Sequence, residues 1–166
     1  MIDRLLIVLG MVATLAVMGA TVVDMEVTSA RGDQVFLELA PRDPRSIIQG
    51  DYMRLGYRVG RQASQEHRGM PTTGDLVISL DDDRVGTFVR FDSDGMLAAS
   101  EHRLDYRVRN NRVDVGVGSW MFEEGTADVW NQARYGEFRV LSGGRAVLVG
   151  MRDADLQALG PPLKAW

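Results

Sequence analysis

The sequence predicts a mainly β protein, with an N-terminal transmembrane helix followed by an antiparallel β-sandwich or small β-barrel domain that carries one or two short helices. Two observations lead to this fold class. One unbroken apolar block occupies residues 5–23, and after it apolar residues recur at a period of two in short segments separated by polar turns. Long helices between the strands are missing from this pattern, which argues against a parallel α/β fold.

The apolar block has the length of a membrane span. Residues 5–23 contain no charged residue and no His, Asn, Gln or Pro. As a helix they would be about 28 Å long, close to the roughly 30 Å hydrocarbon core of a bilayer. The hydroxyls of Thr14 and Thr21 can bond back to the preceding helical turn, which lowers their cost in lipid. We therefore expect residues 1–26 to be an anchor whose partner is the lipid bilayer.

The flanking charges predict how the anchor is oriented. Arg4 precedes the apolar block, whereas Asp24 and Glu26 follow it, which favours an N-terminus inside the cell. Residues 27–166 would then form a β-rich domain outside the cytoplasm, tethered to the inner (cytoplasmic) membrane by a single pass. A cleaved signal peptide is the alternative, with a better small-x-small site ending at Ala30 than at Ala20, and it would leave a soluble periplasmic protein.

Local turn chemistry predicts the order of elements after the anchor. Three hairpins are expected, around residues 81–84, around Asn110 and Asn111, and around residues 142–144. Helices are expected at residues 126–133, with Val129 and Trp130 facing inward, and from Asp153 to a point before Gly160. Polar residues 61–74 show no period and are expected to form a mobile loop. The strands are expected at residues 34–39, 53–59, 75–80, 85–91, 104–108, 113–117, 137–141 and 145–149.

Composition excludes several classes of chemistry. The net charge is −4 with no long run of one sign, which argues against a nucleic-acid partner. Because the chain has no cysteine, disulfides, thiol catalysis and cysteine-ligated metals are excluded, and two histidines are too few for a histidine-rich site. The aspartates of residues 81–83 lack the further ligands of a calcium loop and are read as a solvated turn. We expect no cofactor and no metal.

The most particular local pattern lies in residues 41–57. Pro41 and Pro44 hold the chain extended, Gly50 permits a tight bend, and a carboxylate just after it can accept bonds from backbone N–H groups. Polar side chains would converge near this bend, either as a salt-bridged lock at the entry to a strand or as a recognition site. They are Arg42, Asp43, Arg45, Asp51 and Tyr52.

The same segment carries a resemblance to a known family. Gly50, Asp51, Tyr52, Leu55 and Tyr57 match every specified position of the motif that defines the bacterial GDYXXLXY family. Residues 134–140 and 144–150 are similar to the closing segments of that family. The resemblance implies a small protein with one N-terminal membrane segment and no established biochemical function, and it suggests a membrane protein as partner.

A second group of residues offers acid–base chemistry. Glu123 and Glu124 lie beside Trp120 in the sequence and could act as general acid or base if His102 or Tyr135 came close in the fold. Trp120, Phe122, Trp130 and Tyr135 are instead expected to close one end of a sheet.

These patterns lead to one preferred function and to alternatives. We expect a non-enzymatic module that binds or scaffolds another envelope or membrane protein. The first alternative is an extracytoplasmic binder of a small ligand, or a carboxylate-dependent hydrolase, that uses Asp51 or the pair Glu123 and Glu124. The second alternative is the signal-cleaved soluble protein.

Overall fold

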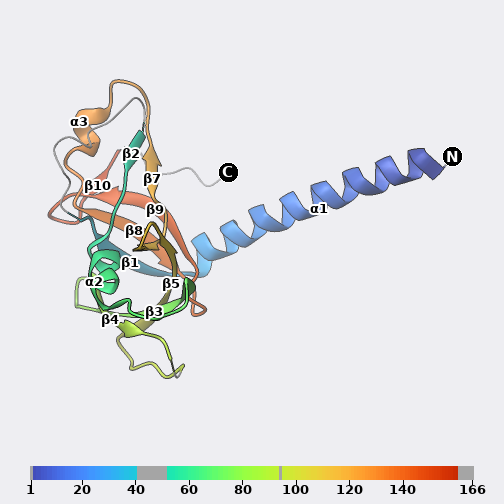
Figure 1. The fold of residues 1–166 in the computed structure, drawn as a ribbon. Helices are drawn as coiled ribbons and strands as arrows, with labels where there is room; N and C mark the ends of the chain where they lie inside the picture. Colours follow the sequence, from blue (N-terminus) through green and yellow to red (C-terminus); the bar gives the residue numbers. More distant parts are fainter. Residues whose placement is uncertain (1, 41–51, 94, 161–166) are drawn as a thin grey trace.

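A β-rich domain with one long helix leaving it makes up the described part of the chain (Figure 1). The computed structural model describes residues 2–40, 52–93 and 95–160, and within the helix it describes the side chains of residues 7, 9–20, 23 and 31.

Helix α1 (Ile2–Arg31) projects away from the β-domain (Figure 1). The Thr14 hydroxyl donates to the Gly10 carbonyl oxygen at 2.9 Å, which confirms the backbone bond expected of this residue. Apolar side chains along the helix are exposed, among them Ile7 at 71% and Val17 at 68%. Among the residues that the structure describes, no helix combines the length and the apolar character needed to cross a membrane.

Three antiparallel sheets form the domain and confirm the mainly β prediction. The first has the order β1 (Asp33–Glu38), β8 (Tyr135–Val140), β9 (Ala146–Arg152) and β10 (Ala158–Leu159). The second has the order β4 (Gly86–Phe91), β3 (Thr73–Leu80), β5 (Glu101–Arg109) and β6 (Arg112–Val115). The third pairs β2 (Tyr52–Arg54) with β7 (Ser119–Met121).

The three predicted hairpins are confirmed, and their turn residues explain them. Asn110 and Asn111 have φ values of 49° and 59° between β5 and β6, which is the geometry of a type I′ turn. The Asp81 carboxylate accepts bonds from the backbone N–H groups of Asp83 and Val85 and so closes the turn between β3 and β4. Gly144, with φ 89°, turns the chain between β8 and β9.

Two backbone hydrogen bonds join the four-stranded sheets. The Phe36 N–H donates to the Arg84 carbonyl oxygen at 2.9 Å, next to a parallel bridge to Val85. The Asp105 N–H donates to the Gly144 carbonyl oxygen at 2.8 Å, so the β8–β9 turn docks on the edge of β5. The sheets share one apolar core, whose fully buried large side chains are Phe138, Leu37, Met53, Leu76, Ile78, Leu104, Met151, Val35, Val59 and Val140.

The region after β2 differs from the sequence prediction. The strand expected over residues 53–59 ends at Arg54, and Arg58–Glu66 forms helix α2, so the loop expected over residues 61–74 is wrong for its first part. Val59 and Ala63, one helical turn apart, face the core. A Cβ at Gly60 would lie 2.5 Å from the Val113 carbonyl oxygen, so only glycine allows the helix this close to β6.

The two helices predicted in the C-terminal half are corrected as well. Helix α3 (Ala127–Trp130) is shorter than residues 126–133; Trp130 is buried as expected, but Val129 is 38% exposed rather than facing inward. The helix expected from Asp153 is wrong. The Asp153 carboxylate accepts hydrogen bonds from the backbone N–H groups of Asp155 and Gln157, which stabilises a turn instead of a helix. Strand β10 follows this turn.

Candidate functional site

The structure describes three of the eight residues proposed in the first polar motif. Arg42, Asp43, Arg45, Gly50 and Asp51 lie outside the described residues. Tyr52 begins β2 and pairs with Met121. Leu55 is partly buried and packs against the core, and Tyr57 is buried within it.

Tyr57 connects the two ends of the sequence resemblance. Its hydroxyl donates to the Val117 carbonyl oxygen at 3.1 Å. Its ring meets the ring of Phe138 edge to face, with centroids 5.3 Å apart. A Cβ at Gly136 would lie 3.1 Å from Tyr57 Cε1, so the absent side chain makes room for the tyrosine. Tyr57 therefore packs on the segment that contains Gly136 and Phe138 and serves as a packing residue.

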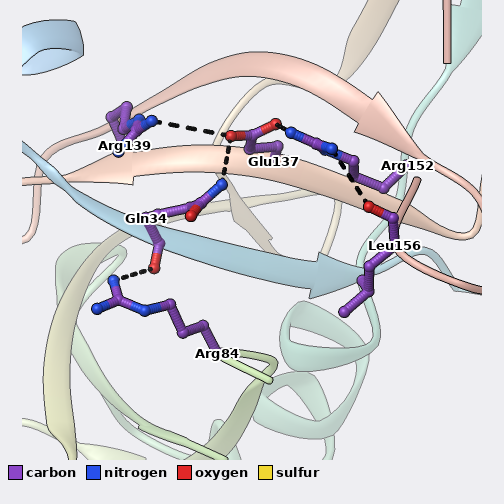
Figure 2. Close-up of polar contacts among 6 residues, drawn as sticks. All are labelled: Gln34, Arg84, Glu137, Arg139, Arg152 and Leu156. Carbon is purple, nitrogen blue, oxygen red and sulfur yellow. Dashed lines mark hydrogen bonds and ion pairs between the residues drawn. The ribbon is translucent and has the colours of Figure 1, made fainter. Parts of the chain in front are cut away.

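Glu137 lies at the centre of a polar network in the first sheet (Figure 2). Glu137 is buried, with only 7% of the residue exposed. Its Oε2 accepts bonds from Arg152 Nε at 2.8 Å and from Arg152 Nη2 at 2.6 Å, while its Oε1 accepts a bond from Gln34 Nε2 at 2.7 Å. Arg139 Nη2 lies 4.0 Å from Oε1. Both carboxylate oxygens are thus paired, as a buried charge requires.

Arg152 extends this network to other parts of the domain. Its Nη1 donates to the Leu156 carbonyl oxygen at 3.2 Å (Figure 2), and its guanidinium lies 5.8 Å from the centroid of the Phe36 ring. The network joins β1, β8, β9 and the turn after β9. Sequence reasoning missed it, because the only signal is an acidic residue in an apolar strand, and its partners are known only once the register of β8 and β9 is fixed.

The second candidate group is not assembled into one site. His102 lies on β5, and its Nε2 is 3.4 Å from an Asp33 carboxylate oxygen, at the point where α1 joins β1. Glu123 and Glu124 are exposed, and Tyr135 begins β8 opposite Glu38. Within the described parts of the chain, no hydrogen bond or ion pair connects His102, Glu123, Glu124 and Tyr135 with one another.

The aromatic residues of this region pack together. The ring centroids of Trp120 and Trp130 are 5.4 Å apart, and those of Phe122 and Trp130 are 6.4 Å apart. Trp120 and Phe122 are partly buried against the core, and the Trp130 indole N–H donates to the Thr126 hydroxyl at 3.1 Å. These contacts give Trp120 a packing role rather than a place beside a carboxylate.

A pair of carboxyl groups that the sequence did not single out lies across β3 and β5. Asp75 and Asp105 are directly opposite one another in the register, and their side chains hydrogen bond. Partial burial and the hydrogen bond and charge of Asp75 raise the pKa of Asp105 to about 6, which the nearby Arg145 guanidinium opposes. Asp105 therefore keeps its proton to a higher pH than an ordinary aspartate does.

The surroundings of this pair fix its geometry. A Cβ at Gly144 would lie 2.5 Å from Asp105 Oδ1 and 3.2 Å from Asp75 Oδ1, so the turn between β8 and β9 sits against both carboxyl groups. Tyr106 donates its hydroxyl proton to the Pro71 carbonyl oxygen at 3.0 Å, and burial together with the charge of Asp75 raises its pKa. The pair can bind and release a proton where the two large sheets meet. No sequence pattern marks it, because only the register of β3 against β5 brings the two residues together.

Comparison with known proteins identifies one match. The sequence model of the family described as GDYXXLXY protein matches residues 14–151, from within α1 to β9. No curated protein and no solved structure is significantly similar to the chain.

Proposed function

The chain belongs to the GDYXXLXY protein family, and within that family we propose that it is a membrane-anchored, extracytoplasmic module whose β-domain binds or scaffolds another envelope or membrane protein. The proposal has two parts, the anchor and the binding role, and each has its own support.

The exposure of α1 is the observation that carries the proposal. Apolar side chains at Ile7, Leu9, Leu15 and Val17 are each 60–71% exposed, although they belong to one unbroken apolar block. Leaving a large apolar side chain in water instead of burying it costs about 1.5–3 kcal/mol. Several such residues on one projecting helix favour an apolar surrounding for it. A bilayer provides it for the whole of residues 5–23 at once.

The structure of the domain supports a binding role over catalysis. Tyr57 and Trp120 are held by ring packing, and Glu137 is fully paired with Arg152 and Gln34. Glu123 and Glu124, the proposed acid–base residues, are exposed on the surface. Chemistry by general acid or base needs such groups held within reach of a substrate and of one another. A rigid β-domain tethered to a membrane is suited to presenting a surface to another protein.

A charge placed in the apolar block tests the anchor. We expect Leu15→Arg to move the full chain from the membrane fraction to the soluble or aggregated fraction after carbonate extraction, because arginine in the middle of a span costs about 2.5–3.5 kcal/mol. Met121→Arg is the matched control, since Met121 is 80% exposed on the β-domain. Equal extraction of wild type and Leu15→Arg would contradict the anchor.

Two further measurements test the placement and the binding role. N-terminal sequencing of the mature chain should find residue 1 or 2 first, whereas a start after Ala20 or Ala30 would show a cleaved signal and a soluble periplasmic protein. Purification from the native source at native expression levels, in mild detergent, should recover one specific protein in a constant ratio. Recovery of the chain alone would refute the binding role.

A further inference from the structure

The arginines on the outer face of the β4–β3–β5–β6 sheet fall into two groups, those paired with a carboxylate and those without such a partner. Arg90 pairs with Glu101 at 2.8 Å, and Arg103 pairs with Asp92 at 2.7 Å. Farther along the same sheet, three exposed arginines take part in no hydrogen bond or ion pair with any residue that the structure describes. They are Arg107, Arg109 and Arg112. We call these three residues the arginine tip.

The register places the arginine tip on one face of the β5–β6 hairpin. Arg109 lies directly opposite Arg112, and Arg107 lies opposite Asp114. Like charges in directly opposed positions destabilise a sheet. The tight turn at Asn110 and Asn111 holds the two arginines at this spacing. Asp114 offsets one of the three charges, so the tip keeps a net positive charge in a chain whose net charge is −4.

The arginine tip lies farther along β5 than the residue that contacts the end of α1. His102, near the start of β5, contacts Asp33 where α1 joins the sheet. Arg109 ends the same strand, about 23 Å farther on at 3.3 Å per residue. Helix α2 packs along β6 through the bond from the Val113 N–H to the Ser64 hydroxyl, and Figure 1 shows α2 on the side of the domain away from the one that α1 leaves.

The charge and the size of the tip narrow the class of partner. Lipid headgroups carry phosphates and an acidic protein segment carries carboxylates, and the proposed binding of another protein favours the second. Three arginines are also fewer than the six to ten phosphate contacts typical of nucleic-acid binding proteins. Guanidinium groups pair well with carboxylates, and arginine is enriched in protein recognition surfaces.

We propose that the arginine tip is the recognition surface for the protein partner, and that it takes an acidic segment of that partner whose carboxylates pair with Arg107, Arg109 and Arg112. The inference rests on the proposed function, which it extends by naming the surface and the chemistry of the partner.

The test uses the purified full chain in nanodiscs of neutral phosphatidylcholine, with a fluorescein-labelled oligo-glutamate peptide as probe. Wild type should bind the peptide, and the affinity should fall as sodium chloride is raised, because the contacts are exposed ion pairs. Arg109→Glu/Arg112→Glu should weaken binding at least about tenfold, since two attractions become repulsions. Arg54→Glu/Arg134→Glu, at two exposed arginines elsewhere, makes the same change of net charge and should keep the affinity within about twofold.

A single substitution separates binding from folding. Arg109→Glu places an acid opposite Arg112, so the hairpin gains a cross-strand ion pair while the tip loses its net positive charge. We expect this variant to unfold at the same or a higher temperature than wild type and to bind the peptide more weakly.

Three results with the peptide alone would overturn the inference: wild type that does not bind it, equal weakening in the Arg54/Arg134 variant, or equally tight binding of Arg109→Glu. Anionic phosphatidylglycerol vesicles that compete with the peptide at equal charge would also overturn it, in favour of a lipid. All of these are read on the purified chain. They therefore stay distinct from failure of the proposed function, which appears as the absence of a partner in native purification.

Discussion

The carboxyl group of Asp105 hydrogen bonds to the carboxyl group of Asp75 directly across the β3–β5 register. Two carboxyl groups in this position share a proton when one is neutral and repel when both are charged. The turn at Gly144 lies against both. Because the pKa of Asp105 is raised, we expect the contact between the two four-stranded sheets at this point to depend on pH.

The Asp75–Asp105 pair predicts a pH-dependent contribution to stability. The pKa of Asp105 is raised from 3.8 to about 6 in the folded domain, so the folded state binds the proton more tightly than the unfolded state. The contribution is complete below pH 3.8 and is lost as pH rises toward about 6. We expect Asp105→Asn, whose amide keeps the bond to Asp75, to be more stable than wild type at pH 7 by about 1 kcal/mol after screening by solvent.

The measurement is urea unfolding of the full chain in micelles between pH 4 and pH 7.5, followed by tryptophan fluorescence. The difference between variant and wild type is the quantity to compare. The pKa values of Asp92 and Glu101 are lowered by Arg103 and Arg90, and they add the opposite trend to both proteins. Asp114→Asn, an exposed site on β6, should show no such pH-dependent difference. A difference for Asp105→Asn that stays constant across this range would contradict the shared proton.

For the Glu137–Arg152 pair, we expect the loss of one partner to destabilise the domain more than the loss of both. Arg152→Leu leaves the buried Glu137 carboxylate without its main partner and should lower the free energy of unfolding by about 3–5 kcal/mol. Glu137→Leu/Arg152→Leu removes both charges and should recover much of this loss. The full cycle of two single variants and the double variant, measured by urea unfolding, checks the coupling. Additive single losses would show that the two residues act independently.

We expect one added methyl group at Gly116 to lower the stability of the domain strongly. The φ of Gly116 is +61°, and a Cβ there would lie 2.6 Å from Phe138 Cε1 in the core. We expect Gly116→Ala to destabilise the domain by about 2–4 kcal/mol, from backbone strain together with overpacking. Gly143→Ala is the matched control, because nothing lies within 4 Å of a Cβ there and it should be nearly neutral. Similar melting temperatures for both variants would contradict the close packing on Phe138.

We expect the ring of Tyr57 to contribute more to the stability of the domain than its hydroxyl does. Tyr57→Phe removes the bond to the Val117 carbonyl oxygen and should cost about 0.5–1.5 kcal/mol. Tyr57→Ala also removes the edge-to-face contact with Phe138 and should cost about 3–5 kcal/mol. Thermal unfolding by circular dichroism distinguishes the two variants. Equal losses would mean that the hydrogen bond, rather than packing, sets the role of this motif residue.

The sequence allowed prediction of those parts of the fold that local chemistry determines. Asn110 and Asn111 tolerate positive φ, and Asp81 can close a turn with its own carboxylate, so the hairpins could be placed from a few adjacent residues. Helix α2 could not be placed in this way. Its apolar face consists of little more than Val59 and Ala63, and its docking depends on Gly60 reaching the carbonyl oxygen of Val113 on a distant strand.

The candidate site was less predictable, because its contacts join distant segments. Tyr57 was named as a motif residue, but its burial against Gly136 and Phe138 depends on how two sheets meet. The sequence suggests that His102 lies near Glu123, whereas strand pairing puts it beside Asp33. The Asp75–Asp105 pair and the arginine tip follow from strand register, which depends on the packing of the whole domain.

The junction between helix and domain has a mechanical consequence. Helix α1 ends at Arg31 and β1 begins at Asp33, so a single buried residue, Gly32, separates them. With so short a connection, a tilt or rotation of the helix acts directly on the first strand of the sheet, so the orientation of the β-domain follows that of the helix.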